Sequence, residues 1–416
     1  MMKYWPIYLM LFLVPACSSQ TPTEGPDIPA TKSTDSQWNQ MAAQYNHLIR
    51  QSESYAVFPY SYSSESGVES VPAHHWVSGF FPGTLWKLYQ LNPDPAIRTH
   101  AEGWTREMYG QAGNVGTHDL GFMVLNSVGE AYRVDSSDLH RKVILEAARS
   151  LAARFSERVG MIRSWDWGEW QFPVIIDNMM NLQLLYTASE ISGETMYRDI
   201  ATLHARKTAQ SHFRGDYSSF HVVDFDPISG EILKRQTWQG ASDSSAWARG
   251  QAWGLYGFTQ CYLATGDSLF LDVAMRISQF LLQHPNMPTD GVPYWDLDAP
   301  GIPHAPRDVS AAAVMASAWY DLAEIVDHSQ GDEFRTQADL ILEHLQKPPY
   351  WVGDHALGGF LLTESVASIP QGHQVSQPLN YADYYFLEAL IKQRTYQKSR
   401  SHESESGLSS VTTGIH

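Results

Sequence analysis

The chain has 416 residues, of which 43% are hydrophobic and 12% aromatic, enough to bury one large core or two modest ones. Its formal net charge of -17 argues against nucleic-acid binding, because neutralising phosphates requires clusters of Lys and Arg that the chain does not show. An acidic ligand would therefore have to bind in a local basic pocket.

The N-terminus has the pattern of an export signal. Lys3 is followed by an apolar run and then by small residues around Cys17, and the run is too short to span a bilayer. We interpret residues 1–16 as a signal peptide and residues 17–36, rich in Pro, Ser and Thr, as a flexible tether. Residues 14–17 resemble a bacterial lipoprotein cleavage box, which implies lipidation of Cys17 and a periplasmic or outer-membrane-anchored protein. A signal cleaved elsewhere is the alternative.

The body of the chain, residues 37–395, alternates two kinds of helical pattern. Six apolar stretches of helical period each follow a polar or small-residue start, at residues 78–91, 119–133, 177–191, 249–265, 310–326 and 381–393. More amphipathic stretches lie between them, at residues 139–159, 196–213, 268–284 and 331–345.

Six apolar helices, each paired with an amphipathic outer helix, predict an all-α fold of the (α/α)6 barrel type. A stack of solenoid repeats would give a similar pattern, but the uneven spacing of the stretches weighs against it. Residues 396–416, rich in Ser and Gly, are expected to form a disordered tail.

Polar residues gather at the starts of the six apolar stretches, where a site at the rim of a barrel would need them. Any single Asp there could simply cap a helix. Asp177 stands out because it lies in an apolar run, where desolvation should raise its pKa toward the range that a general acid requires. Arg249, also among apolar and aromatic residues, needs a carboxylate partner. That partner could be a substrate carboxylate or an internal Asp.

Other kinds of chemistry lack support in the sequence. The histidines, including His118, do not show the paired spacing of a zinc motif, so we predict no metal and no cofactor. There is neither a glycine-rich phosphate loop nor a Gly-x-Ser-x-Gly motif. Apart from Cys17, Cys261 is the only cysteine, and it lies in an apolar run, so we expect no structural disulfide.

Several segments together resemble glycoside hydrolase family 88, the unsaturated glucuronyl hydrolases. They are HWVSGFFPG (75–83), HDLGF (118–122), IRSW (162–165), IDNMMNL (176–182), SAWARGQAWG (245–254) and NYADYYF (380–386). The resemblance runs from Trp76 to about residue 390, and it implies an (α/α)6 barrel.

The resemblance also implies roles for individual residues. Asp177 matches the catalytic acid and base, and Asp119 matches a second essential aspartate that contacts sugar hydroxyls. The residues that match positions around the unsaturated ring are His221, Gln239, Arg249, Trp253, Trp76, Trp165 and His118. The assignments of His221 and Gln239 depend on their spacing from Asp177 rather than on a distinctive local motif.

The implied reaction removes the 4,5-unsaturated uronic acid that a polysaccharide lyase leaves on the non-reducing end of an oligosaccharide. Asp177 would protonate C4 of the double bond and then activate the water that attacks C5. Three alternatives stay open: an unsaturated rhamnogalacturonyl hydrolase, an inverting glucanase on the same type of barrel, and a non-catalytic surface lipoprotein that binds glycans. The sequence does not specify whether the leaving sugar comes from a glycosaminoglycan, ulvan, gellan or xanthan.

Overall fold

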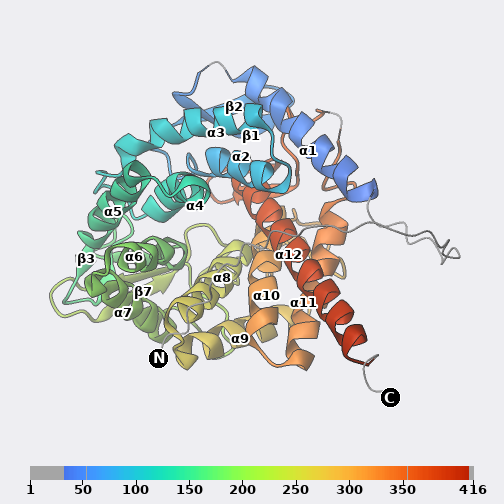
Figure 1. Ribbon diagram of the computed structural model, residues 1–416. Coiled ribbons are helices and arrows are strands. Elements are labelled where there is room, and N and C mark those ends of the chain that lie inside the picture. The colour runs from blue at the N-terminus through green and yellow to red at the C-terminus, as the bar shows by residue number, and fades with distance from the viewer. Residues whose placement is uncertain (1–31, 53, 354, 412–416) are drawn as a thin grey trace, which may run out of the picture.

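The computed structural model describes residues 32–52, 54–353 and 355–411 (Figure 1). The predicted signal peptide, Cys17 and most of the tether lie outside these residues. Helix α1 (Lys32–Gln51) takes in the last residues of the predicted tether. Helix α12 (Asn380–Val411) continues through most of the region expected to be a disordered tail. No described helix is both long enough and apolar enough to cross a membrane.

Six helical elements form a closed inner ring, which confirms the predicted (α/α)6 barrel (Figure 1). Each element contacts the next one along the chain, and the last contacts the first, so the ring closes. The elements are α2 (Phe80–Leu91), the π-helix η2 (Gly121–Gly129) with its continuation α4 (Glu130–Asp135), α6 (Asn178–Ser192), α8 (Ala248–Thr265), α10 (Val309–Ile325) and α12.

An outer layer of amphipathic helices surrounds this ring (Figure 1). Their apolar faces pack on the inner helices, and several begin at Asp or Ser side chains that accept a backbone N–H of the first turn. Besides α1, the layer contains α3 (Pro95–Met108), α5 (Asp138–Ala152), α7 (Thr195–Ser211), α9 (Ser268–Gln283) and α11 (His328–Leu345). A short 3-10 helix, η1 (Tyr109–Gln111), follows α3.

Four small antiparallel sheets lie in the loops between helices. The amphipathic stretch predicted at 139–159 ends as a helix at Ala152, and a strand begins three residues later. The sheets are β1 (Val57–Ser63) with β2 (Gly67–Pro72), β3 (Phe155–Ser156) with β4 (Met161–Ile162), β5 (Pro173–Ile175) with β6 (Val222–Phe225) and β7 (Ile232–Gln236), and β8 (Ser365–Ser368) with β9 (His373–Gln377). Strands β5 and β9 end within three residues of the starts of α6 and α12, so they orient the chain where it enters those helices.

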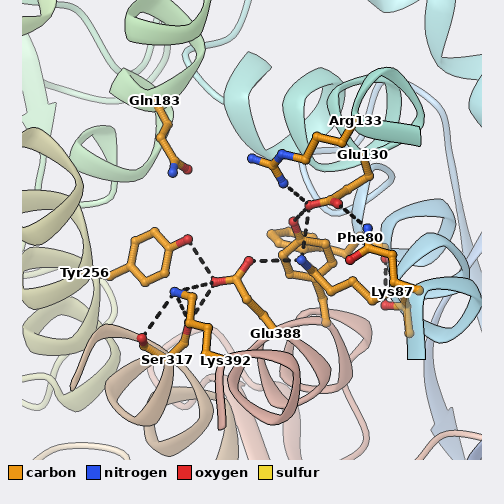
Figure 2. A network of polar contacts seen from close by, with 12 residues as sticks. Phe80, Lys87, Glu130, Arg133, Gln183, Tyr256, Ser317, Glu388 and Lys392 are labelled. Atoms are coloured by element: carbon orange, nitrogen blue, oxygen red, sulfur yellow. Dashed lines mark hydrogen bonds and ion pairs between the residues drawn. The ribbon is translucent and has the colours of Figure 1, made fainter. Parts of the chain in front are cut away.

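A buried ionic network joins inner helices α2, α4 and α12 several residues beyond the starts of the inner elements (Figure 2). Lys87 Nζ lies 3.1 Å from Glu130 Oε1 and 3.0 Å from Glu388 Oε2. Arg133 also pairs with Glu130, and Lys392 lies 3.4 Å from Glu388 Oε1. Because α2, α4 and α12 all contribute charges, the network ties the first and last inner helices together where the ring closes.

Candidate active site

A cavity of about 460 Å³ opens at the starts of the inner helices. Seven of the nine residues predicted to bind or transform substrate line it, and His221 and Trp253 lie behind its wall. The predicted residues in the lining are Trp76, His118, Asp119, Trp165, Asp177, Gln239 and Arg249.

Asp177 stands between strand β5 and helix α6, where the chain enters the inner ring. Its side chain makes no capping bond, and Oδ2 has no hydrogen-bond partner although it is buried. Burial raises the pKa of Asp177 to about 7; the positive charge of Arg249 opposes this shift and the negative charge of Asp119 adds to it. Asp177 can therefore hold a proton near neutral pH, as a general acid must.

Asp119 lies just before the π-helix η2, and burial raises its pKa to about 7 as well. Thr117 donates its hydroxyl to Asp119 Oδ2 at 3.2 Å, and His118 Nε2 lies 3.2 Å from Oδ1. Burial lowers the pKa of His118 to about 3, so its ring is neutral, and its Nδ1 donates to the carbonyl of Ser164. His118 Nε2 thus lies beside the Asp119 carboxyl but makes no hydrogen bond of its own.

A close approach of two inner helices brings the two aspartates to one cavity. A side chain at Gly121, in η2, would have its Cβ 2.7 Å from the Cα of Asn181 in α6, so only glycine fits there. Asn181 Oδ1 accepts the backbone N–H of Phe122 at 2.9 Å, which fixes the two helices against each other. Asp119 and Asp177 are thereby held on neighbouring elements of the ring.

His221 supports Asp177 from behind the cavity wall. Its Nδ1 accepts the backbone N–H groups of Trp238 and Gln239, both at 3.1 Å. Burial lowers the pKa of His221 well below its usual value, so the neutral ring carries its proton on Nε2, which lies 3.6 Å from Asp177 Oδ2. The indole N–H of Trp253 also favours the charged form of Asp177. Two buried N–H groups thus lie beside the Asp177 carboxyl.

Arg249 has an internal partner, one of the two alternatives that the sequence left open. Its Nη1 lies 2.9 Å from Asp308 Oδ2 and also donates to the carbonyl of Val366, while Nη2 donates to the carbonyl of Ala367 at 2.6 Å. Arg249 is only 1% exposed but still lines the cavity. It is thus a fixed positive charge in the cavity wall, in a protein of strongly negative net charge.

Aromatic rings form much of the remaining wall. Trp76 packs on Phe122 and Tyr381 with ring centroids 5.5 and 5.2 Å away, so the inner helices hold it in place. Trp165 approaches His221 edge to face at 5.8 Å. Such faces suit the apolar faces of sugar rings.

Comparison with known proteins identifies the family to which this chain belongs. The chain matches glycosyl hydrolase family 88 over residues 49–284. It is 40% identical to an unsaturated glucuronyl hydrolase of Formosa agariphila, over 93% of this chain and 98% of that protein. The chain belongs to glycosyl hydrolase family 88 and is a glycoside hydrolase.

Solved structures of related enzymes have the same fold as this family 88 enzyme. An unsaturated glucuronyl hydrolase specific for heparin is 42% identical, with a TM-score of 0.84 over 88% of this chain and 99% of that one. A mutant unsaturated glucuronyl hydrolase of Streptococcus agalactiae complexed with dGlcA-GalNAc6S is 28% identical, with a TM-score of 0.74 over 86% of this chain and 90% of that one.

The structure adds residues to the family 88 site that the sequence analysis did not identify. Thr117 bonds Asp119, Asp308 pairs with Arg249, and Trp167, Trp238 and Gln371 line the cavity. Thr117, Trp167 and Trp238 lie within two residues of Asp119, Trp165 and Gln239 and could have been suspected from those places. Asp308 and Gln371 lie far along the chain from the residues they join. Within the described residues, no three His, Cys, Asp or Glu side chains gather as around a metal ion.

Proposed function

We propose that this enzyme removes a 4,5-unsaturated glucuronic acid from the non-reducing end of lyase-generated oligosaccharides by hydrating the C4=C5 double bond. The observation that carries this proposal is Asp177, a buried carboxyl that lines the cavity and whose pKa is raised to about 7. One group that can first give and then take a proton suffices for hydration of an enol ether.

In the first step, Asp177 donates its proton to C4, and positive charge develops at C5 and the ring oxygen. The carboxylate left behind is stabilised by Arg249 and by the N–H groups of His221 and Trp253. The site is thus arranged to favour the charged form of Asp177 just as the proton leaves.

In the second step, the Asp177 carboxylate takes a proton from a water molecule whose oxygen bonds to C5. The product is a hemiketal at C5. When it opens, C5 becomes a ketone and C1 a hemiacetal, which then releases the leaving sugar as an alcohol. The glycosidic bond breaks without direct protonation of its oxygen, unlike the two-carboxylate mechanism of ordinary glycosidases.

Asp119 has a different part in this scheme. With His118 Nε2 3.2 Å from Oδ1 and Thr117 bonded to Oδ2, it is held by neighbours rather than aimed at the double bond. We assign it to binding sugar hydroxyls beside Asp177 and to raising the pKa of Asp177 through its charge. Trp76 and Gln239 complete the walls around the unsaturated ring.

The cellular setting is part of the proposal. We infer that the protein is exported, is lipidated at Cys17 and acts downstream of a polysaccharide lyase, with the N-terminal lipid attaching it to a membrane. The support is the charged, apolar and small-residue pattern of residues 1–17 and the need for a lyase to create the unsaturated terminus. For the leaving sugar we propose glycosaminoglycan fragments first, since the related enzymes named above act on heparin or bind dGlcA-GalNAc6S.

The test follows the ultraviolet absorbance of the conjugated double bond while purified protein acts on unsaturated disaccharides from glycosaminoglycan, ulvan and pectin. We expect the wild type to abolish the signal with at least one glucuronyl substrate and Asp177→Asn to be slower by about 10²–10⁴-fold. Cleavage of pectin fragments alone would favour the rhamnogalacturonyl alternative. No loss of absorbance with any substrate would refute the proposed function and favour a glycan-binding protein.

A further inference from the structure

Two tryptophans at the mouth of the cavity are unusually exposed. Trp167 is 52% and Trp238 is 38% exposed, and no other tryptophan among the described residues is exposed to that degree. Large aromatic side chains normally bury most of their surface, so an exposed pair beside a cavity indicates a binding surface.

The pair is continuous with the active site. Both rings line the cavity that contains Asp177. Trp165, which contacts His221, stacks on Trp167 with centroids 4.7 Å apart, and Trp167 meets Trp238 edge to face at 5.7 Å. The aromatic rings therefore form a path that starts at the catalytic group and leads outward to solvent.

The loop that carries Trp167 is held in place before any ligand binds. Arg154 donates to Asp166 at 2.7 Å and to the carbonyl of Ser164 at 3.1 Å. Gly168 has a φ of +89°, and a Cβ there would lie 2.4 Å from the ring of Trp170, which packs beneath the exposed pair. A surface that is already ordered loses little entropy when it binds a ligand.

Trp238 is anchored at both of its backbone polar groups. Its N–H donates to His221 Nδ1, and its carbonyl accepts Gln371 Nε2 at 3.0 Å. Gln371 in turn bonds Ser368, and both line the cavity together with His373. The mouth thus combines apolar faces with side chains that can bond hydroxyl groups, the combination that saccharides require.

We propose that Trp167 and Trp238 form an outer subsite for a sugar ring of the leaving group, one ring beyond the sugar joined to the unsaturated uronate. Trp165 lies between His221 and Trp167, so it is placed against the nearer ring and the exposed pair against the next one. The inference depends on the proposed function. It implies that the enzyme prefers unsaturated tetrasaccharides to disaccharides.

The test compares kcat and KM for an unsaturated disaccharide and tetrasaccharide that share the same terminal linkage. Trp167→Ala should raise the ratio of the tetrasaccharide KM to the disaccharide KM by about threefold to tenfold, the value of one aromatic contact. Trp238→Ala should act in the same direction, and Trp167→Phe, which keeps an aromatic face, should restore most of the ratio. Leu139→Ala, at an exposed apolar residue of α5, is the matched control and should leave the ratio unchanged.

An unchanged ratio in both alanine variants would overturn the outer subsite, and so would equal rises in KM for the two substrates. Either result leaves the proposed function intact, because the wild type still consumes the disaccharide. If the wild type consumes neither substrate, the proposed function fails first and the subsite fails with it.

Discussion

If Asp177 must donate a proton in the first step, kcat/KM should fall as pH rises through its pKa. Burial raises that pKa to about 7, with Arg249 opposing the shift and Asp119 adding to it. Activity should thus be present below about pH 7 and lost above it. A group of pKa about 7 is protonated to about 91% at pH 6 and about 9% at pH 8, so kcat/KM should fall about tenfold between them.

The same experiment can assign the pKa to a residue. Because burial also raises the pKa of Asp119 to about 7, a single descending limb could belong to the pair. Asp119→Asn removes the negative charge beside Asp177, so the pKa of Asp177 should drop and the limb should move to lower pH, whatever the loss in absolute rate.

The assay is the initial rate of absorbance loss at substrate concentrations well below KM, from pH 5 to pH 9 at constant ionic strength. Circular dichroism at each pH checks that the protein stays folded. A wild-type kcat/KM that is constant or rises from pH 6 to pH 8 would refute Asp177 as the proton donor. A limb that does not move in Asp119→Asn would show that Asp119 does not raise the pKa of Asp177.

Two predictions concern the ionic network (Figure 2). Lys87→Met should lower the free energy of unfolding, measured in urea, by about 3–5 kcal/mol, because it leaves two buried carboxylates without one of their partners. The control is Lys347→Met, at an exposed ion pair, which should lower it by under about 1 kcal/mol. Equal losses in the two variants would contradict a stabilising role for the network. Burial alone would raise the pKa of Glu130, but Arg133 and Lys87 hold it to about 2, below its ordinary 4.5. The stabilisation that charged Glu130 gives is complete above pH 4.5 and is lost as pH falls toward 2, so Tm should drop over that range. Glu130→Gln should make the drop in Tm smaller. A wild-type Tm that does not change over this range would contradict the prediction.

The barrel could be predicted because its inner helices have an unusual composition. A helix surrounded by other helices is apolar on every side, so stretches such as 310–326 differ clearly from the amphipathic outer ones. The strands could not be predicted in the same way. Most contain two to five residues, too few for an alternating pattern to be distinguished from a loop, and their pairing joins segments such as 173–175 and 222–225 that lie far apart.

The site was predictable where a residue's own neighbours in sequence determine its environment. Asp177 in its apolar run is such a case, and burial does raise its pKa as expected. The partner of Arg249 was not predictable, since Asp308 is 59 residues away on the next inner helix. The same holds for Gln371, which lines the cavity and donates to the carbonyl of Trp238, 133 residues earlier in the chain.

Asp177 and Asp308 show why an aspartate before an inner helix cannot be assigned from position alone. Asp308 has extended backbone angles, φ -126° and ψ 92°, which let its carboxylate accept the N–H of Ser310 and cap α10. Asp177 already has helical angles, φ -56° and ψ -27°, and its side chain makes no capping bond. The Asp308 carboxylate is thus occupied by its own helix and by Arg249, whereas the Asp177 side chain caps nothing and lines the cavity. One backbone rotation therefore separates a structural aspartate from one able to act as an acid.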